Sequence, residues 1–121
     1  LFNFLGLKFS QDYGKLYENA VFLKLKREAF AKSSINICYW KNQLHEEVDF
    51  VVKEGLKLKE LIQVCYNIEN PETKKRELRA LIKASNELKC DNLLVVTKDY
   101  EGEESIDKKK IKFIPLWAWS L

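Results

Sequence analysis

Three polar side chains stand in this sequence where the surrounding pattern favours apolar residues. Glu18 lies on a helix stripe with i, i+3, i+4, i+7 spacing, and the other three members of that stripe are apolar. Asp49 lies inside the apolar segment "EVDFVV", and Gln63 lies inside "LIQVCY". A carboxylate or an amide at a buried face is costly unless it is paired, hydrogen-bonded or bound to a metal.

One strand register would bring the three groups together. If the strands that carry Asp49 and Gln63 form a hairpin, both side chains can share a face, and Glu18 could meet them over the sheet. Two carboxylates and an amide oxygen suit Mg²⁺ or Mn²⁺ rather than zinc. Such a metal could activate a water and stabilise charge on a phosphate. Two plainer readings stay open: Glu18 at the rim of its face, and Asp49 on a solvent-exposed strand face, although Val51 there argues against full exposure.

The first half of the chain predicts one helix and three strands. Residues 12–31 predict a helix capped by Asp12, and its apolar positions wrap far enough round to predict burial on most sides. Residues 35–42, 47–53 and 56–68 predict strands, and a hairpin turn at 54–55 joins the last two. Alternation along the second strand places Val48, Phe50 and Val52 on one face.

The second half predicts one more helix and two strands. Asn70 and Pro71 are a helix start signal, and the helix runs through residue 89. Its predicted core face consists of Leu78, Leu81, Ile82, Ser85 and Leu88. Residues 92–97 predict a central strand, 98–110 a solvated loop, and 111–114 a last strand ended by Pro115.

These elements together predict an α/β fold. Strand, helix and strand between residues 56 and 97 predict a right-handed parallel crossover. The order α-β-β-β-α-β-β therefore predicts a mixed β-sheet flanked by helices. Residues 1–10 are apolar and short, and are expected to form a strand or a docking arm. Trp40, Trp117 and Trp119 are expected to serve packing rather than base stacking.

Composition narrows the class of protein. The 121 residues are 46% hydrophobic and 32% charged, which fits a single domain over residues 1–121 with no membrane span. The net charge of +3 is too small to argue nucleic-acid binding by itself. Three cysteines match no zinc or disulfide pattern and favour a reducing, cytoplasmic location. A chain that begins with Leu1 and has no methionine is expected to be a fragment of a longer protein.

A family resemblance adds to this picture. The segments "YENAVFLKLKRE", "YW", "EVDFVV", "LIQVCY" and "ETKKRELRAL" occur in that order between residues 14 and 119. Together they resemble the nuclease-like domain at the C-terminus of many archaeal and bacterial AAA-type ATPases, in the PD-(D/E)XK nuclease superfamily. The resemblance implies a restriction-endonuclease-like fold, an ATPase domain upstream in the same chain, and metal-dependent hydrolysis of DNA.

The resemblance also implies roles for individual residues. Glu18 matches the helix acid of the superfamily, Asp49 its aspartate, and Gln63 its Glu-or-Gln position, so these three are the expected catalytic residues and metal ligands. The backbone carbonyl of Val64, and Glu47, could add to the metal shell. Cys65 stands where the superfamily has a lysine, and a thiol supplies no positive charge to the attacking water or the phosphate. The sequence therefore predicts either a nuclease or a degenerate relative of one.

Other basic residues could replace the lysine. Arg76, Arg79 and Lys83 fall on one stripe of the second helix, where they could contact DNA phosphates or could simply form a solvated face. Lys53, Lys59 and the turn residue His45 are further candidates, the last with exposure as its plainer reading. Three functions stay open at this level: an Mg²⁺- or Mn²⁺-dependent nuclease, a degenerate module that binds nucleic acid or protein, and a purely structural or dimerising domain.

Overall fold

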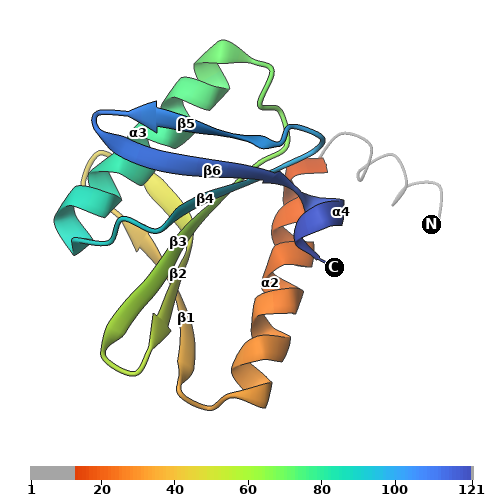
Figure 1. Cartoon of the computed structure of the whole chain (residues 1–121), viewed down its shortest axis with the longest axis vertical. Helices are drawn as coiled ribbons and strands as arrows, with labels where there is room; N and C mark the ends of the chain where they lie inside the picture. The colour runs from red at the N-terminus through yellow and green to blue at the C-terminus, as the bar shows by residue number, and fades with distance from the viewer. Residues whose placement is uncertain (1–12, 121) are drawn as a thin grey trace.

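The computed structural model describes residues 13–120 of the chain, so the expected arm at residues 1–10 and the expected cap Asp12 lie outside the described residues. In chain order the elements are α2 (Tyr13–Ala31), β1 (Ile35–Lys41), β2 (Glu47–Glu54), β3 (Lys57–Cys65), α3 (Pro71–Leu88), β4 (Leu93–Thr97), β5 (Gly102–Ile106), β6 (Lys109–Pro115) and α4 (Leu116–Trp119). This is an α/β fold in which helices flank one mixed sheet, as predicted (Figure 1).

The six strands of the sheet lie in the order β1-β2-β3-β4-β6-β5. β1, β2 and β3 pair antiparallel, as two consecutive hairpins. β3, β4 and β6 pair parallel, which confirms that the connection from β3 through α3 to β4 is a parallel crossover. All five residues of β4 are buried, which confirms it as a central strand.

Two hydrophobic cores cover the two faces of the sheet. α3 lies over one face, where Leu78, Leu81 and Ile82 pack on strand residues such as Leu61 and Val95. α2 and α4 lie over the opposite face, and Figure 1 shows them side by side, away from α3. The predicted core face of α3 is confirmed for four of its five members, and Leu88 is half-buried. Asn70 caps this helix, because its side chain accepts from the N–H groups of Glu72 and Thr73.

The prediction that α2 is buried on most sides is wrong. Only Val21 and Leu25 are buried among its residues, whereas Leu23 is 55% and Phe30 is 94% exposed. Among residues 13–120, the helix therefore contacts the sheet along one narrow stripe that contains Val21 and Leu25. An apolar residue can lie in solvent without unfolding a helix, so composition alone did not reveal which side is covered.

The predicted loop at residues 98–110 contains an edge strand instead. β5 pairs antiparallel with β6 through a tight turn at Asp107 and Lys108, which both have positive φ, of 51° and 66°. This is the backbone of a two-residue hairpin turn, usually marked by Asn-Gly or Asp-Gly. Neither residue is glycine, and β5 carries two glutamates, so neither the turn nor the strand was recognisable from residue types.

A β-bulge breaks the alternation predicted for β2. Two β2 residues, Asp49 and Phe50, stand opposite the single β1 residue Tyr39, because the register shifts between Cys38 and Trp40. As a result, Val48 packs in the hydrophobic core beneath α3, whereas Phe50 and Val52 pack in the core beneath α2. The prediction that these three residues share a face is therefore wrong.

The aromatic and sulfur-containing residues fall into different environments. Trp40 is buried and Trp119 packs against the α2 core, as predicted, but Trp117 is 64% exposed. Cys38 is exposed, Cys65 and Cys90 are buried, and all three are free thiols. Within residues 13–120, no helix combines the length and apolar character that crossing a bilayer requires.

Candidate functional site

The candidate site lies where β2 and β3 diverge. The ladder between these strands ends, on this side, at the pair Phe50 and Ile62. Beyond that pair, side chains take over the hydrogen bonds of the backbone. The N–H of Asp49 donates to Oε1 of Gln63 at 2.9 Å, and the N–H of Val64 donates to Oδ2 of Asp49 at 2.8 Å. The bulge in β2 thus turns the Asp49 carboxylate toward the backbone of β3.

Gln63 lies beside Asp49, as expected, but its amide is engaged with the backbone. The residue is fully buried. Its Nε2 donates to the carbonyls of Glu47 at 2.9 Å and Glu77 at 3.1 Å, while its Oε1 already accepts from Asp49. The side chain therefore joins β2, β3 and α3, and it lies on the α3 side of the sheet, whereas Glu18 comes from α2 on the other side.

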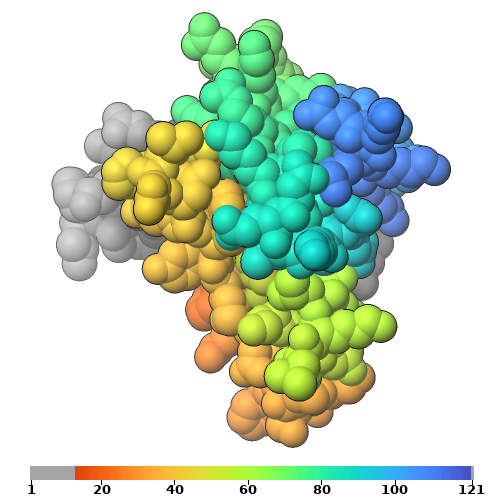
Figure 2. Space-filling view, turned by 90° about the vertical axis from the view of Figure 1, so that its left-hand side faces the viewer, coloured from red at the N-terminus to blue at the C-terminus, as the bar shows by residue number. Residues whose placement is uncertain are grey.

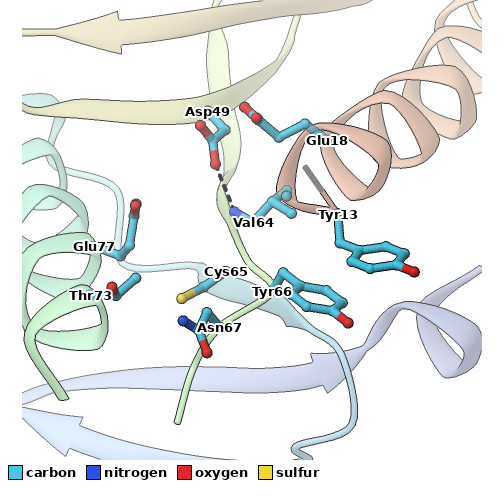
Figure 3. A pocket seen from close by; sticks show the side chains of 10 residues that line it. Tyr13, Glu18, Asp49, Val64, Cys65, Tyr66, Asn67, Thr73 and Glu77 are labelled. Atoms are coloured by element: carbon cyan, nitrogen blue, oxygen red, sulfur yellow. Dashed lines mark hydrogen bonds between the residues drawn. The ribbon is translucent and has the colours of Figure 1, made fainter. Parts of the chain in front are cut away.

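Asp49 and Glu18 meet at a hollow of about 530 Å³, which we call the acidic hollow. Figure 3 shows the Glu18 carboxylate directed from α2 toward Asp49, above Val64, with Glu77 reaching in from α3. The residues that matter to its chemistry are Tyr13, Glu18, Asp49, Cys65, Tyr66 and Glu77. Three carboxyl groups from three different elements therefore converge on one hollow.

Burial and neighbouring charge raise the pKa of Asp49 to about 8. Loss of hydration is the largest cause, the hydrogen bond from Val64 opposes it, and repulsion from Glu18 and Glu77 adds to it. A hydrogen bond between the Asp49 and Glu18 carboxyl groups also favours the protonated form of Asp49. An acid held at such a pKa marks a place where negative charge lacks compensation, and a cation would supply it.

Glu77 is a site residue that sequence reasoning missed. It is half-buried, and desolvation raises its pKa, with Glu18 and Glu47 adding to the shift and Arg76 opposing it. The available signal was its place at the border of the apolar face of α3, directly before Leu78. That position is common for ordinary helix glutamates, so it was not distinctive without the tertiary structure.

Cys65 is a neutral, buried thiol at the floor of the same hollow. It is 3% exposed, and burial raises the pKa of its thiol to about 11, with Glu77 adding to the shift. A thiol with such a pKa is protonated at neutral pH and is a poor nucleophile and base. It supplies no positive charge where the resemblance leads one to expect a lysine.

The predicted basic residues of α3 line a second hollow, of about 460 Å³, which we call the basic hollow. It is lined by His45, Asp49, Arg76, Glu77, Arg79 and Lys83, together with neighbouring residues. Since Asp49 and Glu77 border both hollows, the two adjoin at these acids. In Figure 2 the turn that carries His45 (yellow) lies directly beside α3 (green to cyan).

Ion pairs hold two of these cations in place. Lys83 binds Oε1 of Glu46 at 2.7 Å, and this hydrogen bond is the main reason that the pKa of Glu46 is lowered. Arg76 lies 3.5 Å from Oε1 of Glu77. Arg79 forms no hydrogen bond or ion pair with any residue in the described part of the chain, so its charge is available to a ligand.

Two hydrogen bonds to one side chain stabilise the turn beside the basic hollow. Oδ1 of Asn42 accepts the N–H groups of Leu44 and Glu46. His45, between them, has a positive φ of 62°, in the left-handed region that residues other than glycine adopt infrequently. The alternative candidates Lys53 and Lys59 line neither hollow, and Lys59 pairs with Glu54 at the opposite end of the hairpin.

The donor set fits a divalent cation in part. Glu18 and Asp49 present carboxylate oxygens to one hollow, and oxygen atoms are the ligands that a hard cation requires. Val64, which also lines this hollow, has a backbone carbonyl as a further oxygen. Gln63 does not fit as a ligand, because its side-chain amide is hydrogen-bonded to the backbone of β2 and α3, on the side of the sheet opposite α2. Among residues 13–120, no three His, Cys, Asp or Glu side chains form a ready-made metal cluster, so waters or substrate oxygens would have to complete the shell.

Comparisons with known proteins show a family whose description assigns no function. A family profile described as "Domain of unknown function (DUF4143)" matches residues 13–119. The uncharacterized protein MJ1544 of Methanocaldococcus jannaschii is 42% identical over 127 residues, an alignment that covers 100% of this chain and 27% of the relative. The chain thus spans about a quarter of the length of that relative. No solved structure matches significantly.

Proposed function

This chain belongs to the DUF4143 family, and we propose that it is a nuclease-like domain that hydrolyses phosphodiester bonds in DNA with Mg²⁺ or Mn²⁺. One observation carries the proposal: the half-buried Asp49 carboxyl group faces the Glu18 carboxyl group across a hollow that opens beside a cluster of cations. The resemblance of the segments around these residues to PD-(D/E)XK nucleases supports it. By the same resemblance, the partner domain in the full-length protein is an AAA-type ATPase.

Glu18 and Asp49 would hold the cation, with the Val64 carbonyl as a further ligand. A bound Mg²⁺ or Mn²⁺ would supply a Lewis acid for a phosphate oxygen and lower the pKa of a bound water. Gln63 would position Asp49 rather than bind the cation: its side chain accepts the Asp49 N–H and donates to the Glu47 carbonyl, which fixes the backbone of β2 on both sides of Val48. Arg79, and Lys83 when it leaves Glu46, would contact phosphates on either side of the bond that is cut.

A second function is favoured by Cys65. With a neutral thiol at Cys65, none of the described residues that line the acidic hollow is a lysine or an arginine, so a domain that binds nucleic acid without cutting it is the main alternative. Both functions use the basic hollow, and they differ only in turnover.

A cleavage assay with matched variants tests the proposal. Purified protein is offered linear duplex, single-stranded and branched DNA with Mg²⁺, Mn²⁺ or EDTA. We expect Mn²⁺ to support cleavage of at least one form, and expect Glu18→Gln and Asp49→Asn to abolish it. Glu28→Gln is the control, because Glu28 is an exposed glutamate of the same helix that lines neither hollow.

The outcomes separate the two functions. Cleavage that persists in Asp49→Asn would come from a contaminating nuclease and would refute the proposal. Absence of cleavage together with salt-dependent DNA binding that Arg79→Ala weakens would favour the binding module instead.

A further inference from the structure

Three tyrosines form an aromatic cluster at one wall of the acidic hollow. The rings of Tyr13 and Tyr66 stack with centroids 5.2 Å apart and an interplanar angle of 17°. Tyr17 meets Tyr66 edge-on, at 4.9 Å and 79°. These contacts join the start of α2 to the end of β3, so the Tyr66 ring is held from two sides. Tyr13, at the outside of the stack, remains 43% exposed.

The cluster lies on the opposite side of Asp49 from the basic hollow. Tyr13 and Tyr66 line the acidic hollow but not the basic hollow, whereas Arg76, Arg79 and Lys83 line only the basic one. Figure 3 shows the two rings side by side, away from Glu77 and α3, with Glu18 and Asp49 above them in this view. A positive charge also stands at the aromatic wall, because Nζ of Lys98 lies 5.5 Å from the Tyr66 centroid.

This arrangement suits a nucleotide chain that runs from the tyrosines, past the carboxyl pair, to the cations of α3. A partly exposed ring, held by a second ring, offers a flat surface on which a base can stack. The carboxyl pair would then stand next to the phosphate that follows that base, and further phosphates would reach the cations of α3. A base inside a duplex is already stacked on both faces and cannot enter the hollow, whereas an unpaired base can.

We therefore infer that the ligand of this site is single-stranded DNA, with one unpaired base stacked on Tyr13 in the acidic hollow and the adjoining phosphates on Arg79 and its neighbours. The inference deepens the proposed function and rests on it for the orientation of the strand at Glu18 and Asp49. It differs from the proposed function in that it names the form of DNA that binds and the side chain that selects it.

Measurements of DNA binding by the chain of 121 residues test the inference. The affinities of a fluorescein-labelled single strand, the same strand with abasic sites, and a blunt duplex are compared by fluorescence anisotropy in Ca²⁺. We expect the single strand to bind most tightly, and Tyr13→Ala to weaken that binding about tenfold while leaving duplex binding unchanged. Arg79→Ala should weaken binding of both forms, since phosphates are common to them.

Two variants separate stacking from an effect on folding. Tyr13→Phe keeps the ring and should keep the affinity for the single strand. Tyr39→Ala removes a tyrosine of β1 that is 72% exposed and lines neither hollow, and it should change nothing. Circular dichroism and thermal unfolding of Tyr13→Ala verify that the variant is folded.

The results distinguish this inference from the proposed function. Equal affinity for the duplex, equal affinity for the abasic strand, an unchanged affinity in Tyr13→Ala, or no binding to any form would each overturn the inference. Asp49-dependent cleavage of a blunt duplex would keep the proposed function while it refuted the inference. Tyr13-dependent binding of the single strand without cleavage would support the inference and refute the proposed nuclease activity.

Discussion

Hydrogen bonds connect Asp49 to Gln63 and to the residue after it at the point where β2 and β3 diverge. The backbone N–H of Asp49 donates to the Gln63 side chain, and the Asp49 side chain accepts from the residue after Gln63. Each side chain replaces a backbone partner that the parting strands have lost. The carboxylate is therefore fixed by the same contacts that close the end of the sheet, which couples the stability of this end to the geometry of the acidic hollow.

The first prediction concerns Gln63. Gln63→Leu leaves the N–H of Asp49 and the carbonyls of Glu47 and Glu77 without their partner. We expect the free energy of unfolding, measured in urea, to fall by about 3 kcal/mol, because each buried group left unsatisfied is costly. Gln43→Leu, in an exposed turn, is the control and should change it by less than about 0.5 kcal/mol. A loss in Gln63→Leu no larger than in this control would mean that the three contacts contribute little.

The second prediction concerns pH. In the unfolded chain Asp49 loses its proton near the ordinary pKa of 3.8, but in the folded chain it keeps the proton up to about 8. The folded state therefore binds the extra proton between these values, and the free energy of unfolding falls as pH rises through this window. The slope from this group is at most about 1.4 kcal/mol per pH unit, and it vanishes above pH 8.

Asp49→Asn isolates this effect. Asparagine can still accept the N–H of Val64 but does not ionise, so the variant should gain stability over the original chain as pH rises. Urea unfolding in EDTA at several pH values measures the difference. Parallel pH profiles for the two proteins would show that Asp49 ionises normally in the folded state. Glu77, whose pKa is also raised, contributes a slope of the same sign that remains in both proteins.

The third prediction concerns Cys65. Cys65→Lys places an ammonium group near Glu77 and Asp49, in a hollow whose described lining residues include no lysine or arginine. If the rest of the scaffold is competent, the rate of Mn²⁺-dependent cleavage should rise about tenfold or more, since one added charge of this kind can stabilise the transition state substantially. Cys38→Lys, at an exposed cysteine, should leave the rate unchanged. A folded Cys65→Lys protein with an unchanged rate would show that the thiol does not mark a missing group.

The sequence was enough to predict the elements that are marked by an apolar pattern or by helix-capping and proline residues. Asn70 and Pro71 mark the start of α3, the apolar run before Thr97 marks the central strand β4, and Pro115 marks the end of β6. These signals are local, so no tertiary knowledge is needed to read them. The prediction that Glu18 lies near Asp49 is confirmed. It was possible because each residue is polar within an apolar pattern, and both patterns predicted packing at the same sheet.

The remaining features depend on contacts between distant residues. The bulge in β2 is a mismatch with β1 and leaves no mark in β2 itself, so the faces of Val48 and Phe50 were predicted wrongly. Gln63 was predicted to point toward Glu18, but the backbone carbonyl of Glu77 lies within reach of its amide on the other side of the sheet. Glu77 itself enters the hollow only because α3 crosses this end of the sheet.

The central claim is that Glu18 and Asp49 together hold a divalent cation, and calorimetry of Mn²⁺ binding at pH 7 tests it most directly. Asp49 carries a proton at this pH, because its pKa is about 8, and a cation must displace that proton to bind. Titrations in two buffers with different ionisation enthalpies should show release of about one proton per Mn²⁺ bound. The release should be absent in Asp49→Asn. Failure of Mn²⁺ to bind, or binding that releases no proton and is unchanged in Asp49→Asn and Glu18→Gln, would contradict the claim.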